Sequence, residues 1–267
     1  MTSPPGPLHA LFADATVVPP EASELAWYRQ QFPADAGLVL DVACGIGRVL
    51  VPLAAQGQKV HGVDASEALL ERCTARLAAC GAQAPTFRQP LPQLNLPFRY
   101  GGAYVADGAL QAFTDPATMH AVLERIRAHL VAPGTLVIDC RIPPQAQQRL
   151  AAPLVEVRTA RLADGSQIAL RAETAWTPQM HDDALAFTPA AAGPSCAAAG
   201  SLRAERRYVH RRGAQRLAEE HESLRAVWFA PADLLEAVRA AGFHDARVSP
   251  SPSPLPADEA FAVIARV

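Results

Sequence analysis

One segment, residues 38–70, constrains the fold of this chain more than any other part of the sequence. It reads LVLDVACGIGRVLVPLAAQGQKVHGVDASEALL: an apolar run, a turn with two glycines, a helical stretch and a second apolar run that ends in an acidic residue. This order predicts a parallel β-sheet with crossover helices. Glycines let a ligand approach the turn closely, and the helix that follows offers unpaired N–H groups. The segment therefore predicts a site for a nucleotide-like cofactor.

The acidic residue after the turn limits the kind of cofactor. Asp64 lies 19 positions after Gly45 and ends the second strand, where a carboxylate can bind both hydroxyls of a ribose. Dinucleotide-binding proteins use the same arrangement, but their G-x-G-x-x-G turn has a third glycine. Leu50 occupies that position here. The spacing therefore favours S-adenosylmethionine over NAD.

The rest of the chain continues the alternation and then interrupts it. Further strands are predicted at 86–88, 103–106 and 135–140, and a helix at 116–130. Two hairpins are then predicted, around Asp164-Gly165 and around Gly213, before a helix at 231–241 and strands at 243–248 and 261–266. We expect an α/β fold: a doubly wound, Rossmann-like sheet of seven strands with an antiparallel β insertion that caps the active site. The expected parts are an irregular segment at 1–20, a cofactor domain at 21–143 and 230–267, and the insertion at 144–229.

At the glycine turn the sequence resembles the class I S-adenosylmethionine-dependent methyltransferases of the small-molecule type. The motifs that carry the resemblance are Gly45-Ile46-Gly47-Arg48 and Gly62-Val63-Asp64-Ala65-Ser66, with a softer match at Pro133-Gly134-Thr135. The resemblance covers residues 21–143, and more loosely 229–267. It implies a seven-stranded fold, S-adenosylmethionine as cofactor and a methyltransferase activity on an oxygen, nitrogen or carbon atom of a small molecule.

The resemblance also implies which residues hold the cofactor. Asp41 would orient the amino-acid end, the turn would pass beneath the methionine, Asp64 would bind the ribose and Ala65 would line the adenine pocket. The full set of expected cofactor residues is Tyr28, Asp41, Ala43, Cys44, Gly45, Gly47, Arg48, Asp64, Ala65, Gln89, Leu91, Ala106 and Asp107.

Two departures from the family's pattern leave alternatives open. Where the family commonly has a carboxylate for the adenine amino group, this chain reads Gln89-Pro90-Leu91, so the Gln89 side chain and the Leu91 N–H are the expected contacts. Gly101 stands where the family commonly has an aspartate. One alternative is a non-catalytic or weakened cofactor-binding protein with the same fold. The other is an NAD-binding oxidoreductase, which Leu50 disfavours.

Methyl transfer from a sulfonium leaves few catalytic signatures in a sequence. Alignment of the nucleophile supplies much of the rate, and a general base is optional. No catalytic residue is assigned, and His181 and His221 in the insertion are the candidate bases. Arg141, Trp176 and Tyr208 are the candidate substrate contacts, since ligands of doubly wound sheets lie at the carboxyl ends of the strands and aromatic rings can stack on a substrate.

Composition limits the partners. The chain has 24 Lys and Arg against 26 Asp and Glu, and this balance argues against nucleic acid. No apolar run reaches the ~18 residues of a membrane span. The five cysteines and eight histidines lack the spacing of a metal site, and we predict no metal. The expected protein is cytoplasmic, a monomer or homodimer, with a small-molecule substrate. The arginine-rich stretch 203–216 is predicted to be the solvated face of a hairpin.

Overall fold

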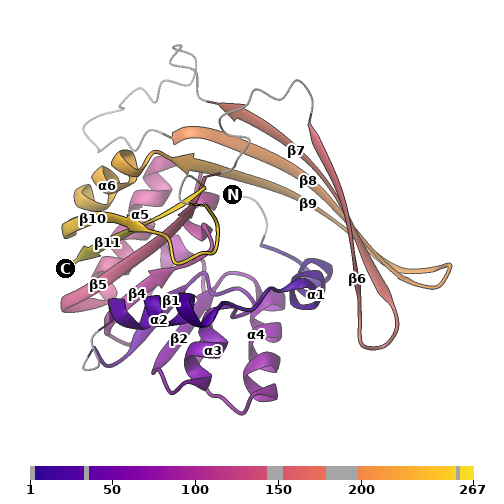
Figure 1. Ribbon diagram of the computed structural model, residues 1–267, viewed down its shortest axis with the longest axis horizontal. Helices are drawn as coiled ribbons and strands as arrows, with labels where there is room; N and C mark the ends of the chain where they lie inside the picture. Colours follow the sequence, from indigo (N-terminus) through magenta and orange to yellow (C-terminus); the bar gives the residue numbers. More distant parts are fainter. Residues whose placement is uncertain (1–3, 33–35, 143–152, 179–197, 257–258) are drawn as a thin grey trace.

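The structure, a computed structural model, describes residues 4–32, 36–142, 153–178, 198–256 and 259–267. Its larger sheet has seven strands in the order β10-β11-β5-β4-β1-β2-β3 (Figure 1). Strands β1 to β5 are parallel, and β10 and β11 are antiparallel to their neighbours. The predicted fold class is thereby confirmed. The strands are β1 (Val39–Val42), β2 (Val60–Asp64), β3 (Thr86–Arg88), β4 (Tyr100–Val105), β5 (Leu130–Arg141), β10 (His244–Pro250) and β11 (Ala260–Arg266).

Helices cover both faces of this sheet. Successive strand residues point to opposite faces: Leu40 and Val42 pack with α5 and α6, whereas Val39 packs with α2, α3 and α4. The helices are α2 (Ala22–Gln31), α3 (Leu50–Ala55), α4 (Glu67–Ala79), α5 (Pro116–His129) and α6 (Pro231–Ala240), with short 3-10 turns η1 (Leu91–Gln93) and η2 (Ala109–Ala112). Ser66 and Asp115 start α4 and α5 by accepting a backbone N–H with their side chains.

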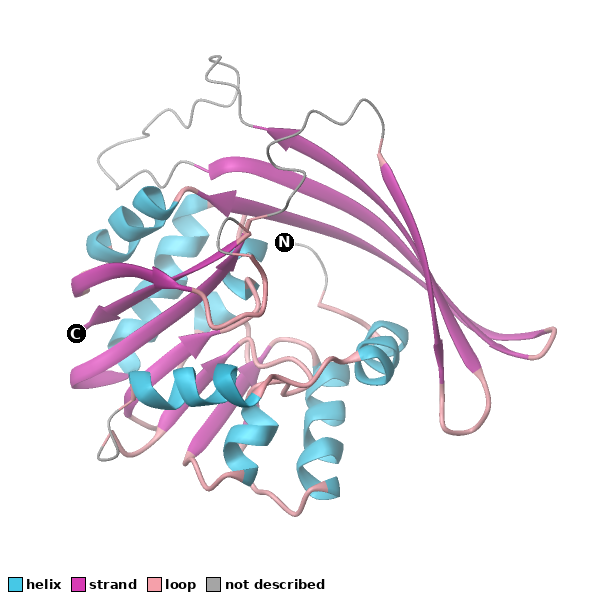
Figure 2. Cartoon of the chain, viewed as in Figure 1, coloured by secondary structure: helices cyan, strands magenta, loops and turns pink. Residues whose placement is uncertain are grey.

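The second sheet is an antiparallel meander that extends well beyond the main body (Figure 2). Its strands are β6 (Leu154–Arg161), β7 (Gln167–Pro178), β8 (Ala198–Arg212) and β9 (Gln215–Phe229), and each pairs with the next. Gly165 and Gly213 have positive φ angles at the two predicted hairpin turns. Exposed arginines of the stretch 203–216 pair with acidic side chains on the same sheet, as expected of a solvated face.

The prediction of an irregular N-terminal segment is wrong at α1 (Pro7–Thr16). The prolines bound this helix instead of interrupting it: Pro7 is its first residue, where no helical N–H is needed, and Pro19 follows its end. The helix lies between the second sheet and α4 (Figure 1). One face, with Leu8 and Phe12, packs on the second sheet. The other face packs on Ile46 of the glycine turn and on α4.

Side-chain hydrogen bonds join the second sheet to the rest of the molecule. The Gln111 amide donates to the carbonyls of Arg141 (2.8 Å) and Val227 (3.0 Å), and its oxygen accepts the Arg141 N–H. Glu220 of β9 accepts the first N–H groups of α1, from Leu8 and His9, so that a carboxylate caps the positive end of the helix. The second sheet is therefore fixed to the end of β5 and to α1. Within the described ranges, no helix is long and apolar enough to cross a membrane.

Candidate functional site

The glycine turn follows β1 at the carboxyl end of the sheet. Ala43, Gly45 and Gly47 all have positive φ angles, so the backbone folds back sharply before α3. The two glycines are required for different reasons. A Cβ on Gly47 would lie 2.6 Å from the sulfur of Cys73 on α4, whereas a Cβ on Gly45 would meet nothing within 4 Å. Gly47 therefore permits packing, and Gly45 leaves open space beside the turn.

Asp64 ends β2 beside this turn. Its carboxylate accepts the backbone N–H of Gly45 at 2.9 Å and that of Ser66 at 2.8 Å. Burial raises the pKa of the Asp64 carboxyl, and these backbone hydrogen bonds oppose the rise. The backbone thus fixes the carboxylate at the position where the sequence predicts a contact with ribose hydroxyls.

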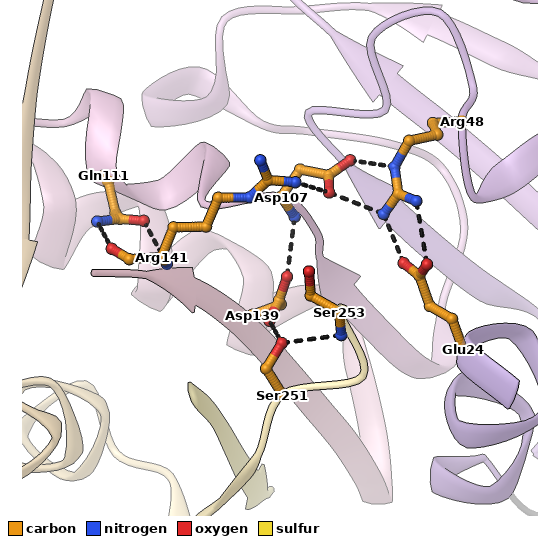
Figure 3. A network of polar contacts seen from close by, with 8 residues as sticks. All are labelled: Glu24, Arg48, Asp107, Gln111, Asp139, Arg141, Ser251 and Ser253. Atoms are coloured by element: carbon orange, nitrogen blue, oxygen red, sulfur yellow. Dashed lines mark hydrogen bonds and ion pairs between the residues drawn. The ribbon is translucent and has the colours of Figure 1, made fainter. Parts of the chain in front are cut away.

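Four carboxyl groups lie near the ends of β1, β4 and β5, and we call them the acidic cluster: Glu24, Asp41, Asp107 and Asp139. Arg48 of the glycine turn binds two of them (Figure 3). Its guanidinium donates to Asp107 at 2.6 and 2.7 Å and to Glu24 at 2.5 and 3.2 Å. Burial disfavours the Arg48 cation, but the hydrogen bonds to Glu24 and Asp107 outweigh burial and raise its pKa.

Asp139 is the most buried member at the end of β5, with 1% of its surface exposed. One oxygen accepts the hydroxyl of Ser251 at 2.6 Å, and the other accepts the N–H of Asp107 at 3.3 Å (Figure 3). Burial raises the pKa of Asp139 to about 6; the Ser251 hydrogen bond opposes this rise and the charge of Asp107 adds to it. Asp139 is therefore a carboxyl group that ionises just below neutral pH.

The site carries more negative than positive groups. Arg48 and Arg141 face the carboxylates of Glu24, Asp107 and Asp139, and Arg141 donates to Asp107 at 2.6 Å. Burial raises the pKa of the fourth carboxyl group, that of Asp41, well above its usual range, so Asp41 adds little to the negative charge. The hydroxyl of Tyr28 is buried here and, among the described residues, has no hydrogen-bond partner. Burial, followed by the charges of the acidic cluster, raises the Tyr28 pKa. Such a site fits a ligand with positive charges, as in the sulfonium and ammonium groups of S-adenosylmethionine.

Most predicted cofactor residues come together at this end of the sheet. Asp41 is buried at the end of β1, in register with Tyr104 of β4. Tyr28 of α2 packs on the Tyr104 ring at a centroid distance of 5.1 Å. Cys44 is a small buried residue that packs against Gly62. The predicted residues on the glycine turn and the strand ends that follow it are Ala43, Cys44, Gly45, Gly47, Arg48, Asp64, Ala65, Ala106 and Asp107.

The structure also gives a local reason for each departure from the family's pattern. Pro90 directly precedes η1 and its carbonyl accepts the Gln93 N–H, and Leu91 is buried in the core. The Gln89 side chain exchanges two hydrogen bonds with the backbone of Asn95. A Cβ on Gly101 would lie 1.9 Å from the carbonyl oxygen of Ala36, so no aspartate fits there. The amide of Gln89 is thus already engaged in holding its own loop.

The candidate substrate and catalytic residues do not gather at one place. Arg141 lies beside the acidic cluster, but Tyr208 is buried against α1 and packs on Phe12. Trp176 packs on Trp228, and its buried indole N–H lacks a partner in the described ranges. His221 is exposed and paired with Glu219 on the outer part of the second sheet. His181 lies outside the described residues.

Sequence reasoning missed Glu24, Asp139, Ser251 and the link made by Gln111. Asp139 had a usable signal, because it stands near the end of an apolar strand as Asp41 and Asp64 do. Glu24 had none, since an acidic residue in the first turn of a helix is ordinary. Ser251 lies in a serine- and proline-rich loop that sequence patterns do not place in space.

Comparison with known proteins identifies a domain in the first half of the chain. Residues 39–134 match the family model of a methyltransferase domain. The chain carries a methyltransferase domain. The match spans β1 to the start of β5, so this methyltransferase domain includes the glycine turn, Asp64 and Asp107. No curated protein matches the sequence.

Solved structures share the fold of this methyltransferase over nearly its whole length. An S-adenosylmethionine-dependent methyltransferase from Clostridium acetobutylicum has 14% identity and a TM-score of 0.67, with 97% of each chain covered. The CcbJ methyltransferase from Streptomyces caelestis has 23% identity and a TM-score of 0.65, covering 94% of this chain and 91% of its own. The sugar N-methyltransferase KedS8 from Streptoalloteichus has 20% identity and a TM-score of 0.66, covering 92% and 88%. The predicted fold is thereby confirmed, and the family-model match of residues 39–134 agrees with the predicted methyltransferase family and its cofactor, S-adenosylmethionine.

Proposed function

We propose that this methyltransferase transfers the methyl group of S-adenosylmethionine to an amine of a small polar molecule. The observation that carries the proposal is the acidic cluster, in which the carboxylates of Glu24, Asp107 and Asp139 face two guanidinium groups at the carboxyl ends of the strands. An excess of negative charge attracts a protonated amine and repels an anion. It gives no comparable advantage to a neutral alcohol.

The names of structural neighbours agree with an amine substrate. KedS8 is named a sugar N-methyltransferase, and CalS10 of Micromonospora echinaspora an amino pentose methyltransferase. The CalS10 structure, which holds S-adenosylmethionine, has 19% identity and a TM-score of 0.64 and covers 97% of this chain.

The chain's own residues suit the cofactor as follows. Asp64, held by the N–H groups of Gly45 and Ser66, would bind the ribose hydroxyls. The open space beside Gly45 would accept the cofactor chain, and the Tyr28 hydroxyl with Asp41 would face its polar amino-acid end. When bound, S-adenosylmethionine supplies a methyl group that the positive sulfur has already activated.

Asp139 and Asp107 would orient the substrate amine. Carboxylates accept N–H groups, so two of them can hold the nitrogen with its lone pair toward the methyl group. Orientation of this kind lowers the barrier by bringing the two reactants to an in-line geometry. A protonated amine would first lose one proton, which the ionised carboxylate of Asp139 can accept. The neutral nitrogen would then take the methyl group as the bond between this group and the cofactor sulfur breaks. We therefore place the main contribution of the acidic cluster in positioning the amine.

Two measurements test the proposal. Calorimetric titration with S-adenosylmethionine should show micromolar binding that Asp64→Ala abolishes, whereas Ala substitution of the exposed Asp245 should leave it unchanged. Transfer of a labelled methyl group should then be measured on matched pairs of amino sugars and the corresponding sugars. We expect transfer to the amine member only. Binding without transfer to any member would favour a non-catalytic protein, and transfer to the alcohol member would refute an amine substrate.

The predictions of cellular location and of other binding partners come from the sequence alone. The expectations of a cytoplasmic protein that does not bind nucleic acid stay predictions, which fractionation and a DNA-binding assay at defined salt would check. We likewise propose that the chain has three parts: residues 1–20, residues 21–143 together with 230–267, and residues 144–229. Limited proteolysis should cut first between these parts if they behave as separate units.

A further inference from the structure

Two arginines bind Asp107, and they are held there to different degrees. Arg48 and Arg141 reach its carboxylate from opposite sides (Figure 3). The Arg48 side chain is 20% exposed and makes four hydrogen bonds, two to Asp107 and two to Glu24. The Arg141 side chain is 48% exposed, and its one hydrogen bond within the described ranges runs from Nη2 to Asp107 at 2.6 Å. Arg141 is therefore the cation that can leave Asp107 more easily.

The backbone of Arg141 is fixed without help from this ion pair. The Gln111 side chain accepts the Arg141 N–H and donates to the Arg141 carbonyl. Arg141 also pairs with Ala260 of β11. The guanidinium can consequently swing away from Asp107 by rotation about side-chain bonds while β5 stays in place. An ion pair exposed to this extent contributes little to stability, so little opposes the movement.

The charges around Asp107 indicate what Arg141 does. Glu24 balances the charge of Arg48, and Arg141 balances that of Asp107. The carboxylate of Asp139 remains; burial raises its pKa, and the charge of Arg141 opposes this rise. A protonated amine that Asp139 attracts therefore finds Asp107 already balanced by a cation. Because the amine and Arg141 carry like charges, they repel each other when both approach one carboxylate, and the amine must compete with the guanidinium.

A guanidinium and an ammonium group make the same kind of contact with a carboxylate. Both are cations, and both donate N–H groups to its oxygens. The Arg141 guanidinium thus takes a place at Asp107 that the nitrogen of an amine needs. An amine can also donate to Asp139, to which the Arg141 side chain makes no hydrogen bond in the described part of the chain. This second carboxylate gives the amine the advantage in the competition.

We propose that Arg141 is a displaceable counter-ion of Asp107, and that the substrate amine replaces it by cation exchange. This inference rests on the proposed amine substrate. The exchange breaks the ion pair between Arg141 and Asp107 and forms one between the ammonium group and Asp107, while the guanidinium turns to water. No covalent bond changes in this step. Arg141 thereby sets a threshold for binding: a cation that cannot donate N–H groups to the two carboxylates does not displace it.

Binding of a minimal amine tests the exchange. NMR titration with methylammonium should be done at about pH 8, where the amine is protonated and Asp139, with a pKa of about 6, is ionised. Arg141→Met should bind methylammonium about 5-fold more tightly than the native protein, because the competing cation is gone. The affinity of this variant should fall as salt rises, whereas the native affinity should change less, since one cation replaces another there. Tetramethylammonium has the same charge but no N–H group, and it should bind neither protein.

Matched variants complete the test. Arg171 is 51% exposed and pairs with Glu173 on the second sheet, so Arg171→Met should leave methylammonium binding unchanged. Arg141→Lys keeps a competing cation and should stay near the native affinity. Adding Asp107→Asn to Arg141→Met should remove the gain in affinity, because the carboxylate is gone. Arg141→Gln serves as a second neutral variant, and circular dichroism should show that each variant is folded.

Transfer assays separate this inference from the proposed function. For an amino sugar that the native protein methylates, Arg141→Met should lower KM about 5-fold with kcat little changed. If no amine is methylated although Arg141→Met gains affinity for methylammonium, the proposed function fails while the exchange at Asp107 stands. The inference is wrong if folded Arg141→Met and Arg141→Gln bind methylammonium no more tightly than the native protein. It is also wrong if the KM for the amino sugar rises, as expected of an arginine that binds an anionic group of the substrate.

Discussion

Arg48 binds Asp107 through two hydrogen bonds, of 2.6 and 2.7 Å, although 59 positions separate the two residues in sequence. The same guanidinium binds Glu24 on α2. One cation therefore holds together the turn after β1, the segment after β4 and an N-terminal helix. These three parts surround the place where we expect the cofactor and the substrate to meet.

Removing this cation should destabilise the protein. Arg48→Met leaves Glu24, which is 2% exposed, as a buried charge without its partner, and we expect a loss of about 3 kcal/mol in the free energy of unfolding. Urea denaturation measures it. The double variant Arg48→Met/Glu24→Gln should recover at least half of the loss, because the buried charge is gone. If the double variant does not recover stability, the ion pair of Arg48 and Glu24 does not stabilise the fold in the way described.

The two glycines of the turn should respond differently to alanine. Gly47→Ala brings a Cβ within 2.6 Å of Cys73 and should cost about 3 kcal/mol of stability through overpacking and strain. Gly45→Ala meets no atom within 4 Å, so it should cost only about 1 kcal/mol, from its positive φ angle.

Cofactor affinity should distinguish the role of Gly45 from that of Gly47. The Cβ of Gly45→Ala enters the space that we assign to S-adenosylmethionine, and calorimetry should show affinity reduced at least ~10-fold, a change of about 1.4 kcal/mol. Equal affinity in Gly45→Ala and the native protein would contradict the position assigned to the cofactor.

Asp139 should make stability depend on pH. Its folded pKa of about 6 lies above the ordinary value of 3.8, so its contribution is fully present below pH 3.8 and is lost as pH rises through 6. Relative to Asp139→Asn, the native protein should lose about 3 kcal/mol of stability between pH 4 and pH 7. Urea unfolding of both proteins across this range gives the difference. The same substitution at the exposed Asp245 serves as the control and should leave the pH dependence unchanged.

The hydrogen bonds of the Gln111 side chain should stabilise the attachment of the second sheet to the end of β5. Gln111→Leu leaves the Arg141 N–H and the Val227 carbonyl without this partner and should cost about 2 to 4 kcal/mol. Hydrogen exchange should become faster at the end of β9 near Val227 and stay unchanged at the Gly213 hairpin. Leucine at the exposed Gln215 is the matched control. Uniform exchange across β9 would contradict a local attachment.

The sheet and its cofactor turn were predictable because each depends on neighbours in sequence. The predicted strand 86–88 is β3 itself, and the predicted helix 116–130 differs from α5 by one residue at its end. Strand β5 is longer than predicted: it begins at Leu130, ahead of the proline and glycine that indicated a turn. Only Leu130 pairs with β4 ahead of Thr135, and the register shifts over residues 131–134, so the proline and glycine form an irregularity inside the strand.

Contacts between distant segments were not predictable. The apolar residues of helix α1 do not lie on a single face, because the helix packs on two surfaces at once. Its flanking prolines suggested an irregular segment. Glu24 and Asp139 take their roles from Arg48 and Ser251, which lie 24 and 112 positions away. Propensity and spacing describe the neighbourhood of a residue along the chain, and such partners lie outside it.

The position of α1 has a consequence for how this sequence can change in evolution. Leu8 and Phe12 pack against the second sheet, while Ala10 packs against Ile46 and Leu69. A single helix of ten residues must therefore match two surfaces that are formed by segments far apart in the sequence. A larger side chain on either surface would tilt the helix and disturb the other. Substitutions near residues 8–12, 46–69 and 160–170 should therefore covary among homologues, and a sheet taken from a relative should fit this chain only when its own first helix comes with it.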